Sequence, residues 1–216
     1  MSSFPNSPKL LKGGIVLIDP ATSAVQRIIA LQYNPDSLSR TLQVQGAGEH
    51  GDRSEALRLK GPAVETIKLE AEIDATDAME AGNTVVGQAG ISPQLAALET
   101  LLYPSTGQLN TNHMLSSLGT LEILPMETAL SLFVFGQNSV LPVRVTEFSV
   151  TEEAFDPNLN PIRAKVSLGL RVLSVDDVGF THKAGGLFMG YLQQKESLRA
   201  KAQAGTLGTL GLTGIP

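Results

Sequence analysis

The stretch VETIKLEAEID, residues 64–74, alternates apolar and charged side chains over almost its whole length. Its regularly spaced apolar positions are Ile67, Leu69, Ala71 and Ile73. Successive side chains of a β-strand point to opposite faces, so this pattern buries one face of a strand and leaves the other in water. It predicts an antiparallel sheet that is covered on one side only.

Other segments continue this strand character. Residues 14–18, GIVLI, form an apolar run that ends at Asp19-Pro20, and residues 25–33 and 40–45 also alternate. Residues 164–173 form a second clean strand, in which the inward positions are Val166, Leu168, Leu170 and Val172. These segments predict a chain dominated by β-structure.

The middle of the chain predicts a hairpin. Residues 130–135 are apolar on both faces, which favours a strand that is covered on both sides. Gly136-Gln137-Asn138 then offers a turn, and residues 140–150 continue as a strand. The alternation slips near Thr146, which predicts a β-bulge.

Residues 92–103 are the one strong helix signal. Ser92 is a capping residue, Pro93 suits the first helical position, and Pro104 ends the segment. The apolar positions at helical spacing are Leu95, Leu98, Leu101 and Leu102. We therefore predict a β-rich α+β domain, an antiparallel sandwich or partly closed barrel with one flanking helix.

The other segments are predicted to be less regular. The expected loops are residues 46–62, 105–118 and 152–161, with an irregular stretch at 77–90 and a short strand at 121–124. We divide the chain into an N-terminal arm (1–12), a main domain (13–175) and a C-terminal extension (176–216). In the extension we expect a flexible joint at Gly185-Gly186, a helix over 188–204 and a Gly/Thr/Leu tail.

Composition favours an assembly protein. Of the 216 residues 42% are hydrophobic and only 17% are charged, against about 25% charged in average soluble domains. Large permanent interfaces use such apolar surface; a large monomer core is the alternative. The net charge of −5 gives no basis for nucleic-acid binding. We expect neither a membrane span nor a signal peptide, hence synthesis in the cytoplasm.

Candidate chemistry is sparse. The three histidines, His50, His113 and His182, fall in predicted loops without metal-ligand or catalytic spacing. Glu152-Glu153 and Asp156 cluster beside Phe155, but neighbouring carboxylates on a loop do not flank a substrate bond. The chain has no cysteine and none of the common nucleotide-binding or nucleophile motifs. We expect no enzyme activity, no cofactor and no metal.

The segment YNPDSLSR, residues 33–40, resembles the tube-type proteins of contractile injection systems, which include phage tails, tailocins and extracellular injection particles. Residues 64–70 resemble the central strand of that family, and residues 92–104 resemble its flanking helix. Residues 155–173 resemble its last loop and strand. The order and spacing of these features, over about residues 10–175, carry the resemblance.

The resemblance implies the phage tail-tube fold, built into a ring of six identical copies. It implies a tube initiator or hub adaptor, which joins the inner tube protein to the central spike hub (VgrG-like) and to other baseplate subunits. Many relatives continue into a LysM-like domain, but residues 174–216 do not resemble one. The inner tube protein itself is the main alternative. A carbohydrate-binding β-sandwich is a weaker one, because the chain has three tyrosines and no tryptophan.

Three groups of residues are candidate interface positions. The first is the turn Tyr33-Asn34-Pro35, and the second is a basic patch in the long loop: Arg53, Arg58 and Lys60. The third comprises the apolar anchors of the tail: Leu207, Leu210, Leu212 and Ile215. We expect residues 46–62 and 185–216 to become ordered only against neighbouring subunits, because neither has a core of its own.

Overall fold

The computed structural model describes residues 10–46, 58–117 and 128–215. The described strands form one antiparallel sheet in the order β2-β1-β5-β6-β7-β4-β3. The strands are β1 (Gly14–Ile18), β2 (Val25–Ala30), β3 (Leu38–Gln43), β4 (Val64–Asp74), β5 (Leu130–Val134), β6 (Val140–Phe155) and β7 (Pro161–Val172). The β-rich α+β class predicted from the sequence is confirmed.

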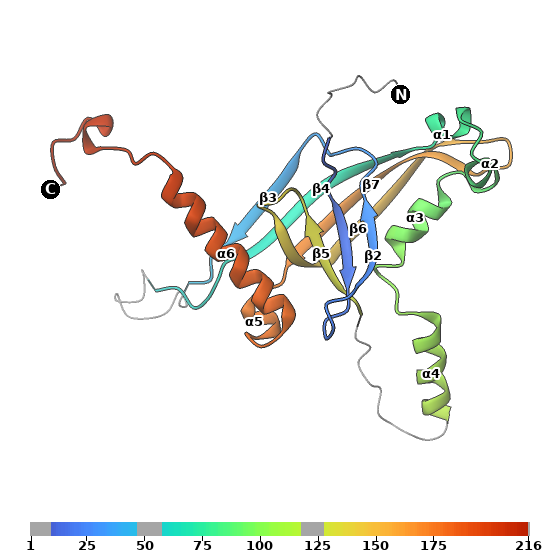
Figure 1. Cartoon of the computed structure of the whole chain (residues 1–216), viewed down its shortest axis with the longest axis horizontal. Helices are drawn as coiled ribbons and strands as arrows, with labels where there is room; N and C mark the ends of the chain where they lie inside the picture. Colours follow the sequence, from blue (N-terminus) through green and yellow to red (C-terminus); the bar gives the residue numbers. More distant parts are fainter. Residues whose placement is uncertain (1–9, 47–57, 118–127, 216) are drawn as a thin grey trace.

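The sheet folds over on itself instead of lying flat. In Figure 1 the long strands β4 and β7 cross the direction of β1 and β2. One hydrophobic cluster contains residues from both parts, among them Ile15 of β1, Leu31 after β2, Leu69 of β4 and Leu168 of β7. The predicted sandwich or partly closed barrel is thus one continuous sheet that encloses its own core, as in a partly closed barrel.

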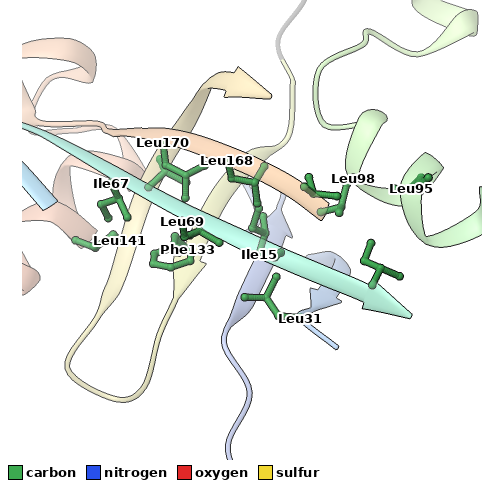
Figure 2. Close-up of a cluster of buried hydrophobic side chains, with 14 of the residues drawn as sticks. Ile15, Leu31, Ile67, Leu69, Leu95, Leu98, Phe133, Leu141, Leu168 and Leu170 are labelled. Carbon is green, nitrogen blue, oxygen red and sulfur yellow. The ribbon is translucent and has the colours of Figure 1, made fainter. Parts of the chain in front are cut away.

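The two alternating strands contribute more buried residues to this core than any other element (Figure 2). On β4 the predicted inward residues are at most 6% exposed, and on β7 the predicted inward residues are at most 2% exposed. β4 and β7 pair with each other, so their apolar faces combine into one surface. Ile15, Phe133 and Leu141 pack against it from β1, β5 and β6.

Strand β5 is buried on both faces, as its sequence predicts. Phe133 belongs to the main cluster, whereas Leu130 and Leu132 lie in a second cluster with Ile18 and Ala184. Ala184 comes from the C-terminal helix, so this helix covers the face of β5 that the main core leaves open.

The β5–β6–β7 connections confirm one prediction and correct another. The pairing of β6 with β7 skips a residue between Val145 and Glu147, which confirms the bulge near Thr146. The predicted loop at 152–161 is wrong in extent, because β6 continues to Phe155 and the turn is short. The Asp156 carboxylate closes this turn by accepting the backbone N–H groups of Asn158 and Asn160.

The helices are more numerous than the single one predicted. The described α-helices are α1 (Thr76–Glu80), α2 (Thr84–Ala89), α3 (Ser92–Glu99), α4 (Thr106–Ser117), α5 (Val175–Val178) and α6 (Lys183–Lys201), and a 3₁₀ turn, η2, covers Leu207–Leu210. α4 replaces a predicted loop. None of its side chains is buried, so it carries no apolar face that periodicity reveals. The strand predicted at 121–124 lies outside the described residues.

Helix α3 differs from its prediction at the N-terminus. Ser92 lies inside the helix and Ile91 takes the capping position, with no side-chain cap. The reason is packing: Ile91 is fully buried, and its N–H donates to the carbonyl of Pro161 at 2.8 Å. Leu95 and Leu98 are buried as predicted, whereas Leu102 is exposed.

The predicted flexible joint at Gly185-Gly186 is wrong. Both glycines lie inside α6, which His182 caps by accepting the N–H of Ala184. A side chain at Gly185 would overlap the carbonyl of Gly179, so glycine here permits close packing of the α6 start on the preceding turn. A side chain at Gly186 would meet open space.

These two neighbouring glycines therefore predict opposite outcomes. Gly185→Ala is expected to lower the free energy of unfolding by about 1–3 kcal/mol, because it overpacks a closed contact. Gly186→Ala is expected to raise it by up to about 1 kcal/mol, because alanine favours the helix. Urea unfolding followed by circular dichroism measures both. Equal effects in the two variants would contradict the close contact.

Candidate functional site: an assembly surface

The described residues weighed for chemistry lie in separate parts of the structure or in ion pairs and helix caps. The described residues contain no group of three or more metal-ligating side chains. His113 lies on α4, and Glu153 forms an ion pair with Lys165 at 3.3 Å. His50 lies outside the described residues. In the part of the chain that the structure describes, no helix is long and apolar enough to cross a membrane.

Strand β6 belongs to two parts of the sheet. β5 pairs only with its first residues, from Val140 to Val143. From Arg144 to Phe155, β6 pairs with β7 on one side, and no described strand pairs with its other side. Strands β3, β4, β7 and β6 therefore form a half-sheet with two free edges among the described residues, β3 and the distal part of β6.

The two edges of the half-sheet run in opposite directions. Each neighbouring pair in the series β3-β4-β7-β6 is antiparallel, and an even number of antiparallel strands gives edges of opposite direction. Thr41, Thr66, Arg171 and Arg144 lie in one row across it. An identical copy in the same orientation thus presents its β6 antiparallel to β3, the arrangement that forms a continuous ladder.

The solvent face of the half-sheet carries charges of both signs. Lys68 of β4 pairs with Glu147 of β6 at 2.7 Å, and both side chains are more than half exposed. Arg163 pairs with Asp74 at 2.7 Å, and Lys165 pairs with Glu153. The hydroxyl and N–H of Thr76 and the guanidinium of Arg163 donate to Asp74 and lower its pKa. These cross-strand pairs balance the face without a strong net field.

A buried carboxylate connects β3, β4 and α6. Glu65 is only 3% exposed, although it is charged. Its side chain accepts hydrogen bonds from Arg40 Nε at 2.7 Å and from Lys195 Nζ at 3.2 Å, and the Tyr191 hydroxyl donates at 3.2 Å. The Lys195 ammonium also lies 4.2 Å from the centre of the Tyr191 ring. We call Arg40, Glu65, Tyr191 and Lys195 the Glu65 cluster.

The Glu65 cluster holds elements together instead of presenting a reactive group. Two cations compensate the carboxylate, and burial of such a charge is tolerated only with partners of this kind. Burial raises the pKa of Tyr191, so its hydroxyl stays protonated and donates. The ion pair with Glu65 raises the pKa of Arg40 against its partial desolvation. The alternation in residues 64–74 contained the signal, since position 65 has the inward phase.

The predicted turn has a structural role at Asn34. The Asn34 side chain donates to the carbonyl of Leu11 at 2.8 Å and accepts the N–H of Gly13 at 2.9 Å, so it fastens the residues before β1. Tyr33 is 44% exposed. Tyr33 and Pro35 line a groove of about 630 Å³. Their role in an interface stays a prediction.

Gln32, the residue before this turn, joins the end of β2 to the end of β4. The Gln32 side chain donates to the carbonyl of Asp74 at 2.6 Å and accepts its N–H at 3.0 Å. A side-chain amide thereby replaces a backbone partner between the end of β2 and the end of β4. Sequence reasoning missed this residue, because only the fold brings positions 32 and 74 together.

The basic patch is only partly described. Arg58 and Lys60 are exposed and flank an isolated bridge between Gly46 and Leu59, whereas Arg53 lies outside the described residues. The Lys60 N–H donates to the carbonyl of Gln45 at 2.9 Å, which continues this pairing. The described ends of the long loop therefore lie together as a ribbon.

The C-terminal extension divides into a docked part and an exposed part. The expectation that everything from residue 185 lacks a core is wrong, since Phe188 and Tyr191 belong to the main hydrophobic cluster. From Glu196 to Ile215 every residue is exposed. The predicted anchors lie in this exposed part: Leu207, Leu210, Leu212 and Ile215.

Comparison with known proteins gives only distant matches. No protein family matches the sequence, and no curated protein matches it. One structural match is to a chain of the tail of an empty gene transfer agent particle with C6 symmetry, at 11% identity and a TM-score of 0.28. Another is to a chain of the native gene transfer agent virion, at 9% identity and a TM-score of 0.26. Each match covers 74% of this chain and 90% of the other.

The Glu65 cluster yields a matched pair of variants on one strand. Glu65→Gln is expected to lower the free energy of unfolding by about 2–3 kcal/mol, because it leaves two cations without their counter-charge. The loss is smaller than for a fully buried pair, since Arg40 and Lys195 are 38% and 35% exposed. Glu70→Gln, on the solvent face, is expected to change it by less than about 0.5 kcal/mol. Urea unfolding compares the two variants. Equal decreases in the free energy of unfolding would contradict a stabilising role of the Glu65 cluster.

The same cluster predicts an alkaline effect. A tyrosine whose pKa is raised on folding contributes stability below its unfolded pKa of about 10, and that contribution disappears as the pH rises through the folded value. The stability difference between wild type and Tyr191→Phe is therefore expected to shrink above about pH 10. Unfolding titrations from pH 8 to 11 measure it. A constant difference over this range would contradict the burial of the hydroxyl.

Proposed function

We propose that this protein is a ring-forming structural subunit of a contractile, phage-tail-like injection particle. The observation that carries the ring is the half-sheet with two free edges of opposite direction. The contractile particle is inferred from the sequence resemblance over residues 10–175. An edge strand presents unpaired N–H and C=O groups, which proteins cover or pair. Head-to-tail contacts between identical copies pair both edges at once and close into a ring when the rotation allows it.

The edge residues support pairing with another chain. On the β3 side Leu42 and Val44 are 50% and 68% exposed, and on the β6 side Phe155 is 49% exposed. Free apolar side chains beside unpaired backbone groups make such edges prone to association. A ring satisfies these groups with a defined partner and pairs both edges of the half-sheet.

The copy number and the position in the particle come from the family resemblance. That resemblance implies six copies per ring and the junction between the inner tube and the central spike. We therefore propose a tube initiator or hub adaptor, with the inner tube protein, the spike hub and baseplate subunits as partners. The bulk inner tube protein uses the same edges and remains the second candidate. The projecting α4 and the exposed C-terminal part favour the adaptor, because they suit unlike neighbours.

Cysteine cross-linking tests the ring, and the natural chain contains no cysteine to interfere. Thr41→Cys on β3 is combined in turn with a cysteine on the solvent face of β6, at Arg144, which lies in the same row, or at Ser149 or Thr151 further along the strand. Disulfides need Cα atoms about 4.4–6.8 Å apart, so only the correct register links. Oxidation of particles assembled from the double variants is expected to give a ladder that ends at six copies on a non-reducing gel.

Each single-cysteine variant is the control and is expected to stay unlinked. A cysteine at Glu70 in place of Ser149 tests specificity, since β4 is an interior strand of the half-sheet. Native mass measurement of the ring gives the copy number independently. One copy per particle, or linkage through Glu70→Cys as efficient as through β6, would refute edge-to-edge closure.

A further inference from the structure

The C-terminal segment from Glu196 to Ile215 is an arm that belongs to neither hydrophobic cluster of the described residues. Every residue in it is exposed. Its larger apolar residues are Leu198, Leu207, Leu210, Leu212 and Ile215. Residues 202–215 form local hydrogen bonds, as in the turn around Thr206 and Thr209. This density of exposed leucine is unfavourable in water and calls for a covering surface.

The root of the arm is fixed beside the β3 edge. Tyr191 and Lys195 join the Glu65 cluster with Arg40, which belongs to the edge strand itself. Gln194 donates to the Asn138 side chain in the β5–β6 turn at 2.8 Å. Figure 1 shows α6 leading away from the sheet and the C-terminus lying far from β2 and α4. The arm thus departs on the side where the proposed ring places the next copy.

The other edge of the half-sheet carries an apolar pocket. It has a volume of about 510 Å³ and lies where β6 separates from β5. Its apolar lining includes Leu101, Leu102, Leu130, Val143, Val145 and Leu173. This volume is in the range of roughly 300–1,000 Å³ in which proteins bury ligands or groups of side chains.

The root of the arm and the pocket lie at the same level along the strands. Thr41, Thr66, Arg171 and Arg144 form one row. Glu65, which holds the arm root, precedes Thr66, and Arg144 stands between the pocket residues Val143 and Val145. When β3 of one copy meets β6 of the next, the arm of the first therefore starts near the pocket of the second.

The arm is long enough to reach this pocket. Residues 196–201 continue α6 beyond its docked part, which adds about 9 Å at 1.5 Å per residue. Residues 202–215 span up to about 46 Å when extended, at roughly 3.3 Å per residue. A bend at Ala202, where α6 ends in an extended conformation, allows the tail to turn back toward the neighbour.

We propose that residues 207–215 of one copy occupy the pocket beside β6 of the next copy, so that each subunit in the ring straps its neighbour. This inference rests on the proposed ring. The occupant is a second copy of this chain, and the leucines of the tail supply the apolar side chains that the pocket accepts. The strap adds a contact that the strand edges alone do not provide.

Two single-cysteine variants, mixed before assembly, test the strap between chains. Leu210→Cys places a thiol on the tail, and Leu102→Cys places one at the pocket. Oxidation of the mixed assembly is expected to give a disulfide-linked pair that contains one chain of each variant. Leu159→Cys is the matched control, because Leu159 is 80% exposed at the β6–β7 turn and does not line the pocket. It is expected to link to Leu210→Cys at least about tenfold less.

The outcomes separate the strap from the ring. Absence of the Leu210–Leu102 link, in particles where the Thr41–β6 link still forms, overturns the strap and leaves the ring intact. Absence of both links overturns both. Equal linkage to Leu102→Cys and Leu159→Cys overturns the strap, since it shows unspecific tail collisions. An intramolecular disulfide in a monomeric Leu102→Cys/Leu210→Cys double variant assigns the pocket to the tail of the same chain and also overturns it.

Deletion of residues 202–216 gives a second readout. The subunit is expected to keep its fold, because residues 202–215 are exposed and contribute nothing to its core. The ring of truncated subunits is expected to dissociate at a protein concentration at least about tenfold higher than the concentration at which the full-length ring dissociates. Unchanged dissociation of the truncated ring would overturn a stabilising strap.

Discussion

Strand β6 is the constraint on which the rest of the structure depends. Its first four residues pair with β5, and the remaining twelve extend beyond that strand along β7. The bulge near Thr146 lies next to the point where the two parts of the sheet diverge, and bulges bend and twist the strands that carry them. Because one strand serves both parts, the sheet folds over a single core, and the same extension leaves a second free edge opposite β3.

The Glu65 cluster ties this edge to the C-terminal helix. Arg40 sits on the edge strand β3, Glu65 on its neighbour β4, and Tyr191 and Lys195 on α6. A buried charge loses its solvation, so the carboxylate is stable only while both cations and the hydroxyl stay in place. The position of α6, and hence the direction of the arm, is therefore coupled to the edge that we propose for ring closure.

The described surface combines features that suit assembly more than catalysis. The solvent face of the half-sheet carries paired charges of both signs, while exposed apolar side chains occur at the strand edges, on helix α4 and on the arm. A monomer has no use for exposed leucines in this number. In the ring that we propose, contacts between identical subunits would give them a partner, and closed symmetry would limit the assembly to a defined size.

The sequence by itself determined the elements whose signal is local. The alternation in residues 64–74 and 164–173 placed both central strands and their inward faces, the two-sided apolar run placed β5 between two clusters, and the phase slip located the bulge. Helix α4 was not predicted, because an exposed helix has no apolar period. The close contact at Gly185 was not predicted either, because a glycine in a flexible joint and a glycine in a close contact look the same in the sequence. Only the tertiary structure decided which strand edges stay free, that the Gln32 side chain bonds to the backbone of Asp74, and that Glu65 meets Tyr191 and Lys195 from more than a hundred positions away. These contacts join segments that are distant along the chain, and a contact between distant segments depends on how the sheet folds over, which no local pattern encodes.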